Sequence, residues 1–261
     1  MTPFTIVQIS DLHCGSPYFV ASLLERTIVE INELAPTVVV VSGDLTNEGY
    51  REEFQAAREY LDQLSCERTI VVPGNHDSRN VGYVHFEELI GERAACLHAD
   101  GVSMVAIDST EPDLDHGTVG RGRYPLIEEN FAREAYLRVF VLHHHLLPIP
   151  GTGRERNVVH DAGDTLECLQ RARVQLVLSG HKHVPYAWRL ENLFVVNAGT
   201  VSTTRLRGKT KPCYNVIEAT PERVAVYRKY PFHEREAIIS FDPRTYEYSK
   251  RQPLFGEDAG G

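Results

Sequence analysis

Five short segments of the sequence place polar side chains that can bind metals or transfer protons directly after apolar runs. They are Asp11-Leu12-His13, Gly43-Asp44, Gly74-Asn75-His76-Asp77, His143-His144-His145 and Gly180-His181-Lys182-His183. Seven groups in these segments are candidate ligands, which is too many for one ion and suits two. Mixed nitrogen and oxygen ligands without a thiolate favour Zn, Mn or Fe over Ca. The candidates are Asp11, His13, Asp44, Asn75, one histidine of 143–145, His181 and His183.

The spacing within these segments favours convergence on a common site. Asp11 and His13 are two positions apart, so in an extended chain both side chains point to one face, and His181 and His183 repeat this arrangement. Glycine directly precedes Asp44, Asn75 and His181, and it permits a tight backbone near an ion. Each motif alone is weak evidence for a functional site; Gly-Asn pairs, for example, commonly form turns. Their joint occurrence after five apolar runs indicates a site.

The segments between these motifs predict the elements that position them. Strands are expected at 4–10, 37–42 and 68–72 and helices at 18–34 and 50–64, which gives a β-α-β-α-β unit with parallel strands. In such sheets, sites form at the carboxyl ends of the strands. Further strands are expected at 102–108, 137–142, 174–179, 193–198, 214–219 and 223–229, and further helices at 82–90, 124–134 and 162–172. The short turns after Gly180 predict a second, largely antiparallel sheet.

Length, charge and cysteine content narrow the class of protein. The 261 residues suit one large domain or one domain with a small appendage, and we expect a main domain at 1–230 and a C-terminal extension at 231–261 whose last residues are disordered. The net charge of −9 argues against a broad nucleic-acid-binding surface. Five scattered cysteines indicate a reducing compartment. No apolar run is long enough to span a membrane and the N-terminus does not resemble a signal peptide, so we expect a cytoplasmic protein.

The five motifs together resemble those of the calcineurin-like metallophosphoesterases. The resemblance covers about residues 4–200, and GDLTNEG, PGNHD, LHHH and GHKH followed by NAGT are most similar to class III cyclic-nucleotide phosphodiesterases and glycerophosphodiesterases. The implied fold is α/β, a four-layer αββα sandwich of two mixed β-sheets flanked by helices. The implied function is hydrolysis of a small-molecule phosphodiester, with a possible homodimer and with neither a nucleic-acid polymer nor a membrane as partner.

The resemblance also implies a role for each candidate ligand. Asp11, His13 and His183 would hold a first metal, Asn75, His143 and His181 a second, and Asp44 would bridge both. His143 is chosen because the family ligand is the first histidine after the strand; His144 is the alternative. His144 and His145 would then lie behind the ligands or face the substrate. Family members more often have proline at the position of His145, and a solvated loop residue is an equally good interpretation there.

His76 and Asp44 are the expected catalytic residues, and Asn75 and His76 are expected to contact the substrate phosphate. In related phosphatases an aspartate three positions after the bridging aspartate orients the counterpart of His76. Asn47 occupies that position here, and its side-chain carbonyl can still accept the ring N–H, but it supplies no charge to stabilise an imidazolium. This favours His76 as a hydrogen-bond donor to the phosphoryl oxygens over a strong general acid. Two Mn, Fe or Zn ions, about 3.5–4 Å apart, would neutralise the phosphoryl oxygens and generate a bridging hydroxide for the attack.

Three further features have a structural and a functional interpretation. Cys14 is expected to be a buried, inert thiol rather than a ligand. The 150–164 segment, with Arg154 and Arg156, could shape the mouth of the site, although solvated loop charges are the commoner case. Arg205, Arg207, Lys209 and Lys211 form a basic run that is usually a solvated face and less often contacts substrate.

Two other functions were considered. A DNA nuclease of the same superfamily is disfavoured by the acidic charge of the chain and by the absence of a long added DNA-binding domain. A metal-free scaffold that keeps only the fold is disfavoured by the full ligand set, because buried carboxylates and imidazoles without an ion would destabilise the core.

Overall fold

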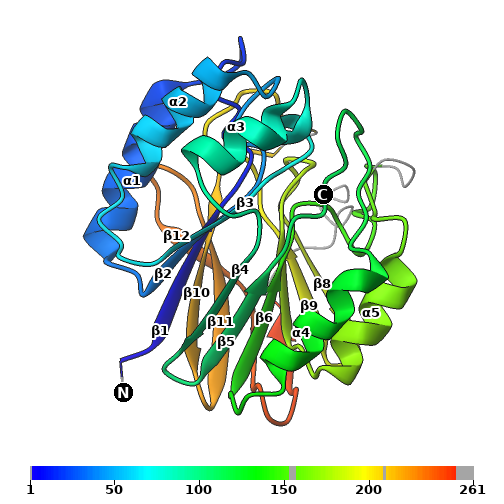
Figure 1. Cartoon of the computed structure of the whole chain (residues 1–261). Helices are drawn as coiled ribbons and strands as arrows, with labels where there is room; N and C mark the ends of the chain where they lie inside the picture. Colours follow the sequence, from blue (N-terminus) through cyan, green and yellow to red (C-terminus); the bar gives the residue numbers. More distant parts are fainter. Residues whose placement is uncertain (1, 153–156, 208–209, 251–261) are drawn as a thin grey trace.

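The computed structural model describes residues 2–152, 157–207 and 210–250. Two sheets pack face to face and helices cover their outer faces (Figure 1). The expected four-layer αββα sandwich of two mixed sheets is therefore confirmed. Arg154, Arg156, Lys209 and the C-terminal residues expected to be disordered lie outside the described residues.

The first sheet has seven strands in the order β13-β12-β11-β10-β1-β2-β3. Strands β1, β2 and β3 are parallel, and β10 joins β1 antiparallel, with Ile6 opposite Ile217. The bounds are β1 (Phe4–Ile9), β2 (Val38–Ser42), β3 (Thr69–Val72), β10 (Tyr214–Thr220), β11 (Arg223–Lys229), β12 (Arg235–Phe241) and β13 (Tyr248–Lys250).

The second sheet has six strands in the order β4-β5-β6-β7-β9-β8. Its four central strands are parallel, and β4 and β8 pair antiparallel at its edges. The bounds are β4 (Ala95–Ala99), β5 (Val102–Ala106), β6 (Leu137–Val141), β7 (Leu176–Ser179), β8 (Tyr186–Leu190) and β9 (Leu193–Asn197).

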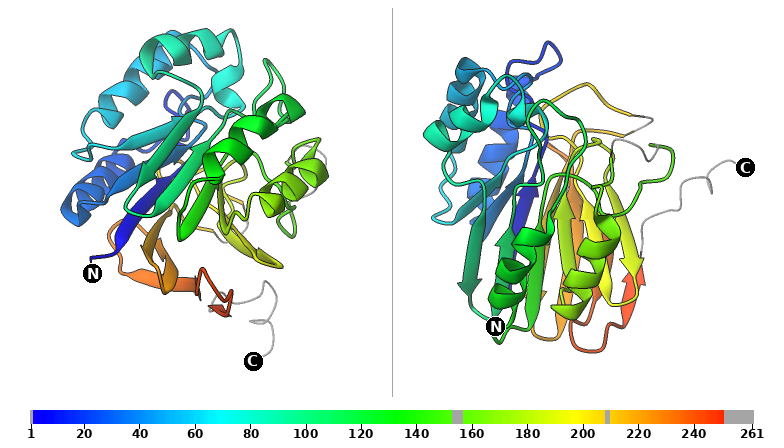
Figure 2. Two further views of the ribbon diagram at one scale, coloured as in Figure 1. Left: turned by 60° about the horizontal axis from the view of Figure 1, so that its bottom comes forward. Right: turned by 45° about the vertical axis from the view of Figure 1, so that its right-hand side comes forward.

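Five α-helices and two short 3₁₀ segments complete the described chain. Helices α1 (Ala21–Leu34), α2 (Arg51–Leu61) and α3 (Gly82–Leu89) cover the first sheet, while α4 (Tyr124–Phe131) and α5 (Ala162–Arg171) cover the second (Figure 2). The 3₁₀ segments are η1 (His76–Ser78) and η2 (Arg121–Arg123). None of the helices within the described residues has the length and apolar character that a membrane crossing needs.

Alternate residues of each central strand enter two different cores. In β2, Val38 and Val40 pack between the sheets, while Val39 and Val41 pack against the helices. A third cluster lies between the second sheet and α4 and α5. Because both faces of these strands are buried, their sequences are continuous β-branched runs rather than alternating ones.

The predicted grouping of the later strands is wrong. Strands β7 and β9 run parallel to β6 in the second sheet, whereas β10, β11, β12 and β13 extend the first sheet antiparallel to β1. Short turns between consecutive strands predict local antiparallel pairing, but they do not reveal which sheet the chain joins. The boundary expected at residue 230 falls between β11 and β12, which pair with each other.

Candidate metal centre

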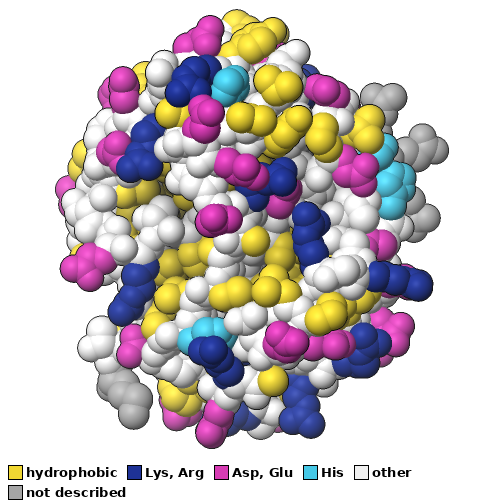
Figure 3. All heavy atoms as spheres, in the orientation of Figure 1, with side chains coloured by type: hydrophobic (Ala, Val, Ile, Leu, Met, Phe, Trp, Pro, Cys, Tyr) yellow, Lys and Arg dark blue, Asp and Glu magenta, His cyan; other side chains and the backbone are white. Residues whose placement is uncertain are grey.

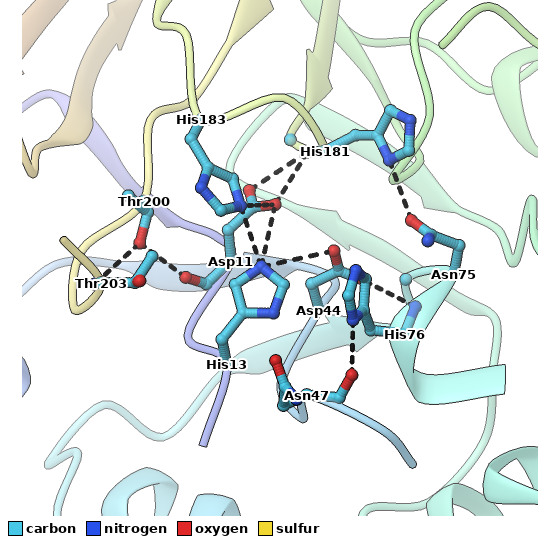
Figure 4. Close-up of polar contacts among 12 residues, drawn as sticks. Asp11, His13, Asp44, Asn47, Asn75, His76, His181, His183, Thr200 and Thr203 are labelled. Atoms are coloured by element: carbon cyan, nitrogen blue, oxygen red, sulfur yellow. Dashed lines mark hydrogen bonds and ion pairs between the residues drawn. The ribbon is translucent and has the colours of Figure 1, made fainter. Parts of the chain in front are cut away.

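Five parallel strands end at the same edge of the sandwich and deliver the candidate ligands there. Strands β1, β2 and β3 of the first sheet and β6 and β7 of the second each precede one motif. The structure brings all seven expected ligands together, and every one is buried (Figure 4 labels six of them). They are Asp11, His13, Asp44, Asn75, His143, His181 and His183.

The first group of ligand atoms combines the loops after β1 and β7. Asp11, His13 and His183 each offer one atom, and these atoms lie within 4.8 Å of one another. The Nε2 atoms of His13 and His183 are 2.9 Å apart, and Nε2 of His183 is 3.4 Å from Oδ1 of Asp11. Two imidazoles and a carboxylate facing one point form a donor set suited to a transition-metal ion.

The second group combines the loops after β2, β3, β6 and β7. Asp44, His143 and His181 form the second set of three, again within 4.8 Å. Nε2 of His143 is 3.3 Å from Nδ1 of His181 and 3.4 Å from Oδ2 of Asp44. The amide oxygen of Asn75 is 2.9 Å from Nδ1 of His181 and 3.2 Å from Nε2 of His143.

Asp44 lies between the two groups. Its Oδ2 is 3.6 Å from Nε2 of His13 in the first group and 3.4 Å from Nε2 of His143 in the second. Its Oδ1 accepts a hydrogen bond from the backbone N–H of His76 at 2.9 Å, which fixes the carboxylate plane. One carboxylate thus faces both sets of ligand atoms, as two closely spaced cations require.

Hydrogen bonds on the far side of two imidazoles fix which nitrogen faces the site. Nδ1 of His143 is 2.7 Å from the carbonyl of Ser42, and Nδ1 of His183 is 2.7 Å from the carbonyl of Arg205. Because each Nδ1 donates its proton to a carbonyl, each Nε2 faces the other ligands. Such outer hydrogen bonds orient histidine ligands in metal sites, so the residues present fit a metal centre.

The backbone at the ligands is held in an uncommon conformation. Five of the seven expected ligands have positive φ, between 53° and 81°. Non-glycine residues seldom adopt this left-handed region, and such strain tends to persist at functional sites. The five are Asp11, His13, Asp44, His181 and His183.

The glycines before Asp44, Asn75 and His181 permit close packing of the ligand loops. A Cβ on Gly180 would lie 1.9 Å from Oγ of Ser10 and 2.7 Å from Oδ2 of Asp11. A Cβ on Gly74 would lie 2.2 Å from Oδ1 of Asp44, and one on Gly43 would lie 2.4 Å from Nδ1 of His143. Only glycine lets these loops approach the ligands.

The electrostatics of the buried groups favour ionised carboxylates. Burial by itself raises the pKa of Asp44, but the neighbouring His143 and His76 outweigh burial and lower it well below its usual range. At Asp11, burial again raises the pKa, but the charge of the neighbouring His183 and its hydrogen bond help to outweigh burial. The pKa of Asp11 is therefore lowered. Burial lowers the pKa of His13 to about 3, so this imidazole is neutral and able to bind a metal.

His76 faces the cavity from the side of Asp44. Its Nδ1 is 2.5 Å from the main-chain carbonyl of Asn47, so the expected side-chain contact of Asn47 is wrong. The Asn47 side chain instead donates to Oε1 of Glu48 at 3.0 Å. A main-chain acceptor orients the ring without needing a particular residue type at position 47. His13, Asp44 and His76 also form a third close set, in which His76 is only half-buried.

The other two histidines after β6 are buried beside the second group, with the ring centroids of His144 and His145 lying 4.8 and 5.7 Å from that of His181. Nδ1 of His144 is 2.9 Å from Oγ of Ser109, and Nε2 of His145 is 2.7 Å from the carbonyl of Gly180. Of the two interpretations of His145, the solvated loop residue is wrong, because its buried side chain binds the loop after β7 that carries His181. Cys14 is buried, as expected, and burial raises its pKa to about 12, which keeps the thiol protonated.

Asp77 has a structural role that sequence reasoning missed. Its carboxylate accepts hydrogen bonds from the backbone N–H groups of Leu45, Thr46 and Gly74 and from the hydroxyl of Thr46. The loops after β2 and β3 are thereby fastened together, so Asp77 positions Asp44 relative to Asn75. Its place at the end of the GNHD motif was the available signal.

A cavity of about 670 Å³ opens in front of the ligands, which is large enough for a small substrate. His13, Asn75, His76, His181 and His183 reach it from the metal-ligand side. The charged residues that line it are Glu48, Arg79, Asp115, Lys182, Arg205 and Arg207.

Comparisons with known proteins agree with this geometry. A probable cyclic nucleotide phosphodiesterase of Xenorhabdus bovienii is 25% identical over 199 residues, which cover 71% of this chain and 78% of the relative. A probable glycerophosphodiester phosphodiesterase of Arcobacter nitrofigilis is 25% identical over 154 residues, covering 54% and 56%. A dimetal phosphatase from Danio rerio has a similar fold, with a TM-score of 0.67 at 14% identity, covering 91% of this chain and 99% of that one. The model of the calcineurin-like phosphoesterases matches residues 4–185, and this chain belongs to that family of metal-dependent hydrolases.

Proposed function

We propose that this chain is a dinuclear-metal phosphodiesterase acting on small phosphodiesters of the cyclic-nucleotide or glycerophosphodiester type. The observation that carries the proposal is the position of Asp44, whose Oδ2 faces His13 in one ligand group and His143 in the other at 3.6 and 3.4 Å. The relatives named above support the substrate class.

Each ligand has an assigned place in this proposal. Asp11, His13 and His183 hold one ion, Asn75, His143 and His181 hold the other, and Asp44 contacts both. Zn, Mn or Fe ions suit this set of imidazole and oxygen donors. When bound, the two ions supply positive charge for the phosphoryl oxygens and an activated water for the attack.

In this proposal, His76 and Asn75 contact the phosphate of the substrate. Because Nδ1 of His76 donates to the Asn47 carbonyl at 2.5 Å, only Nε2 remains to meet the substrate. A protonated Nε2 can donate to a phosphoryl oxygen or to the departing alkoxide, which is the general-acid role that hydrolysis of an alkyl ester needs.

The test uses Asp44→Asn, which keeps the shape of the side chain and a residue type that tolerates positive φ. Bis-p-nitrophenyl phosphate with Mn²⁺ is the assay. We expect kcat/KM to fall by about 10³-fold or more because the carboxylate that contacts both ions is lost. We also expect the variant to bind fewer metal ions per chain than the two expected for the wild type. Asp62→Asn, at the exposed end of α2, is the matched control and should change neither value.

Two outcomes would replace this proposal. Wild-type protein purified with no bound metal and no diesterase activity would favour a scaffold. Cleavage of plasmid DNA, with cyclic nucleotides and glycerophosphodiesters left intact, would favour a nuclease.

A further inference from the structure

The cavity in front of the ligands is lined by two distinct sets of charged side chains. One set consists of Glu48, Arg79 and Asp115, and the other of Lys182, Arg205 and Arg207. We call the second set the cationic triad. Neither set belongs to the ligand groups described above, and the two differ in how their charges are compensated.

The charges of the first set are paired with one another. The guanidinium of Arg79 lies 2.9 Å from Oδ1 of Asp115 and 3.4 Å from Oε1 of Glu48. Arg79 thus already has two carboxylate partners, which leaves its guanidinium less available to a bound anion than the cations of the second set.

The cationic triad differs from the first set in having no direct ion-pair partner among the described residues. Among the residues that the structure describes, no side chain forms an ion pair with Lys182, Arg205 or Arg207. Gathering three cations around one cavity without partners costs electrostatic repulsion, which a bound anion would relieve.

Hydrogen bonds hold the triad in a fixed relation to the metal ligands. Lys182 stands between His181 and His183 in the chain, and the carbonyl of Arg205 accepts the Nδ1 proton of His183 at 2.7 Å. The backbone N–H of Arg205 donates to Oγ1 of Thr203 at 3.0 Å. The triad therefore stands on backbone that is tied to the metal ligands.

The segment before Arg205 is also anchored to the loop between β1 and α1. The N–H of Val20 donates to the carbonyl of Ser202 at 2.7 Å, and the N–H of Thr204 donates to the carbonyl of Tyr18 at 3.0 Å. The hydroxyl of Ser202 donates to the carbonyl of Leu12, between Asp11 and His13 in the chain. A group bound by the triad would thus be placed at a defined distance from the reacting phosphate.

We propose that the cationic triad binds a second phosphate, a monoester, carried by the phosphodiester substrate. The proposal rests on the proposed function, since it names the class of diester that this site prefers. A phosphate monoester suits the triad better than a carboxylate does, because it brings up to two negative charges and oxygens that match the fork of a guanidinium. Cyclic nucleotides and glycerophosphodiesters without a further phosphate would leave the triad unused.

The test compares two ligands that differ only in the second phosphate. Thymidine 5′-monophosphate and thymidine 3′,5′-bisphosphate are titrated calorimetrically into the full chain, with and without Mn²⁺. We expect the 3′-phosphate to tighten binding by about tenfold or more, the effect of one good charge-assisted contact. Their 5′-p-nitrophenyl esters provide the matching pair of substrates for kcat/KM.

Arg205→Gln/Arg207→Gln removes two charges of the triad from exposed positions. We expect this variant to lose most of the gain that the 3′-phosphate gives. Lys211→Gln is the matched control: the residue follows in the same basic run but does not line the cavity, and its substitution should keep the gain. A circular dichroism melt of each variant checks that the fold is intact.

Binding and turnover separate the two proposals. Equal affinity of the wild type for the two thymidine phosphates, or a gain that survives in the double variant, would overturn the role of the triad whether or not the esters are hydrolysed. A gain that the double variant loses, in a protein that hydrolyses neither ester, would support the triad and count against the phosphodiesterase.

Discussion

Five of the seven proposed ligands have their backbone in the left-handed region. The local cost of such a conformation is of order 1–3 kcal/mol per residue, so the surrounding structure must enforce it. The hydrogen bonds of Asp77 to Leu45, Thr46 and Gly74 are part of that enforcement. At the scale of single residues, hydrogen bonds between the loops therefore help to hold the ligands in place.

The contact between His76 and the main chain leads to a prediction about Asn47. Asn47→Ala keeps the carbonyl that accepts the His76 proton, so we expect kcat/KM on bis-p-nitrophenyl phosphate to stay within about threefold of the wild type. His76→Ala removes the imidazole itself and should lower kcat/KM by about 10²–10⁴-fold, the usual contribution of a general acid. Steady-state kinetics with Mn²⁺ measure both. A loss at Asn47→Ala as large as that at His76→Ala would show that the side chain of Asn47 positions His76.

At the scale of elements, the loops after β1 and β7 fit together only because position 180 lacks a side chain. Gly180→Ala would place a Cβ 1.9 Å from Oγ of Ser10 and 2.7 Å from Oδ2 of Asp11. We expect a loss of about 1–3 kcal/mol in the free energy of unfolding from overpacking, together with weaker metal binding as Asp11 is displaced. Urea denaturation and metal analysis measure these effects.

Gly163→Ala is the matched control for Gly180→Ala. Gly163 lies in α5, and nothing lies within 4 Å of the Cβ that alanine would add. Alanine favours helix more than glycine does, so this variant should be as stable as the wild type or up to about 1 kcal/mol more stable. Equal behaviour of the two variants would refute the close approach of the β1 and β7 loops.

Glu30 joins helix α1 to the antiparallel half of the first sheet, and its ionisation should make stability depend on pH. Its carboxylate accepts hydrogen bonds from the hydroxyl of Tyr214 and the N–H of Phe232, and it pairs with Arg26 and Lys229. Burial raises the pKa of Glu30, but these contacts outweigh burial and lower it. Because the pKa of Glu30 is lower in the folded state than in the unfolded state, its ionised carboxylate stabilises the fold at pH values above the unfolded pKa. This stabilisation is lost as the pH falls through the folded pKa.

We therefore expect Glu30→Gln to lower the free energy of unfolding by about 2 kcal/mol at pH 7, the scale of a hydrogen bond to a charged group. The difference from the wild type should shrink as the pH falls below about 4.5, the ordinary value for glutamate. Urea denaturation across pH measures this. Glu59→Gln, on the exposed face of α2, should change little at any pH. A Glu30→Gln deficit that does not depend on pH would contradict the assigned role of the carboxylate.

The elements that could be predicted from the sequence are those buried on both faces. Strands such as β2 are unbroken β-branched runs, and helices such as α1 show clear periodicity, so both were recognised, and the motifs at the strand ends gave the candidate ligands. Strands β4, β8, β12 and β13 were missed because each has exposed or half-exposed positions and mixed composition. The contact of His76 with the Asn47 carbonyl could not be foreseen, because it depends on backbone geometry rather than on residue type.

At the scale of the whole molecule, the site joins the two sheets. Asp11, Asp44 and Asn75 follow strands of the first sheet, whereas His143 and His181 follow strands of the second. Figure 3 shows one face of the molecule, on which acidic and basic side chains are interspersed. Because the proposed ligands come from both sheets, ions bound there would act as cross-links between the two halves of the sandwich.

Removal of metal should consequently lower the stability of the entire fold. At a metal concentration about 100 times the Kd, binding stabilises the native state by about 2.7 kcal/mol, which corresponds to about 5–10 °C in Tm for a chain of this size. Differential scanning calorimetry of the protein before and after chelation, and after Mn²⁺ is restored, measures the shift. A Tm that is insensitive to chelation and to added Mn²⁺ would contradict the cross-linking role.

The central claim is that Asp44 stands between two metal ions, and anomalous diffraction from crystals of the Mn²⁺-loaded protein tests it most directly. We expect two anomalous peaks about 3.5–4 Å apart, one beside Asp11, His13 and His183, the other beside Asn75, His143 and His181, with a carboxylate oxygen of Asp44 in contact with both. A single peak, or peaks that Asp44 does not contact, would contradict the account.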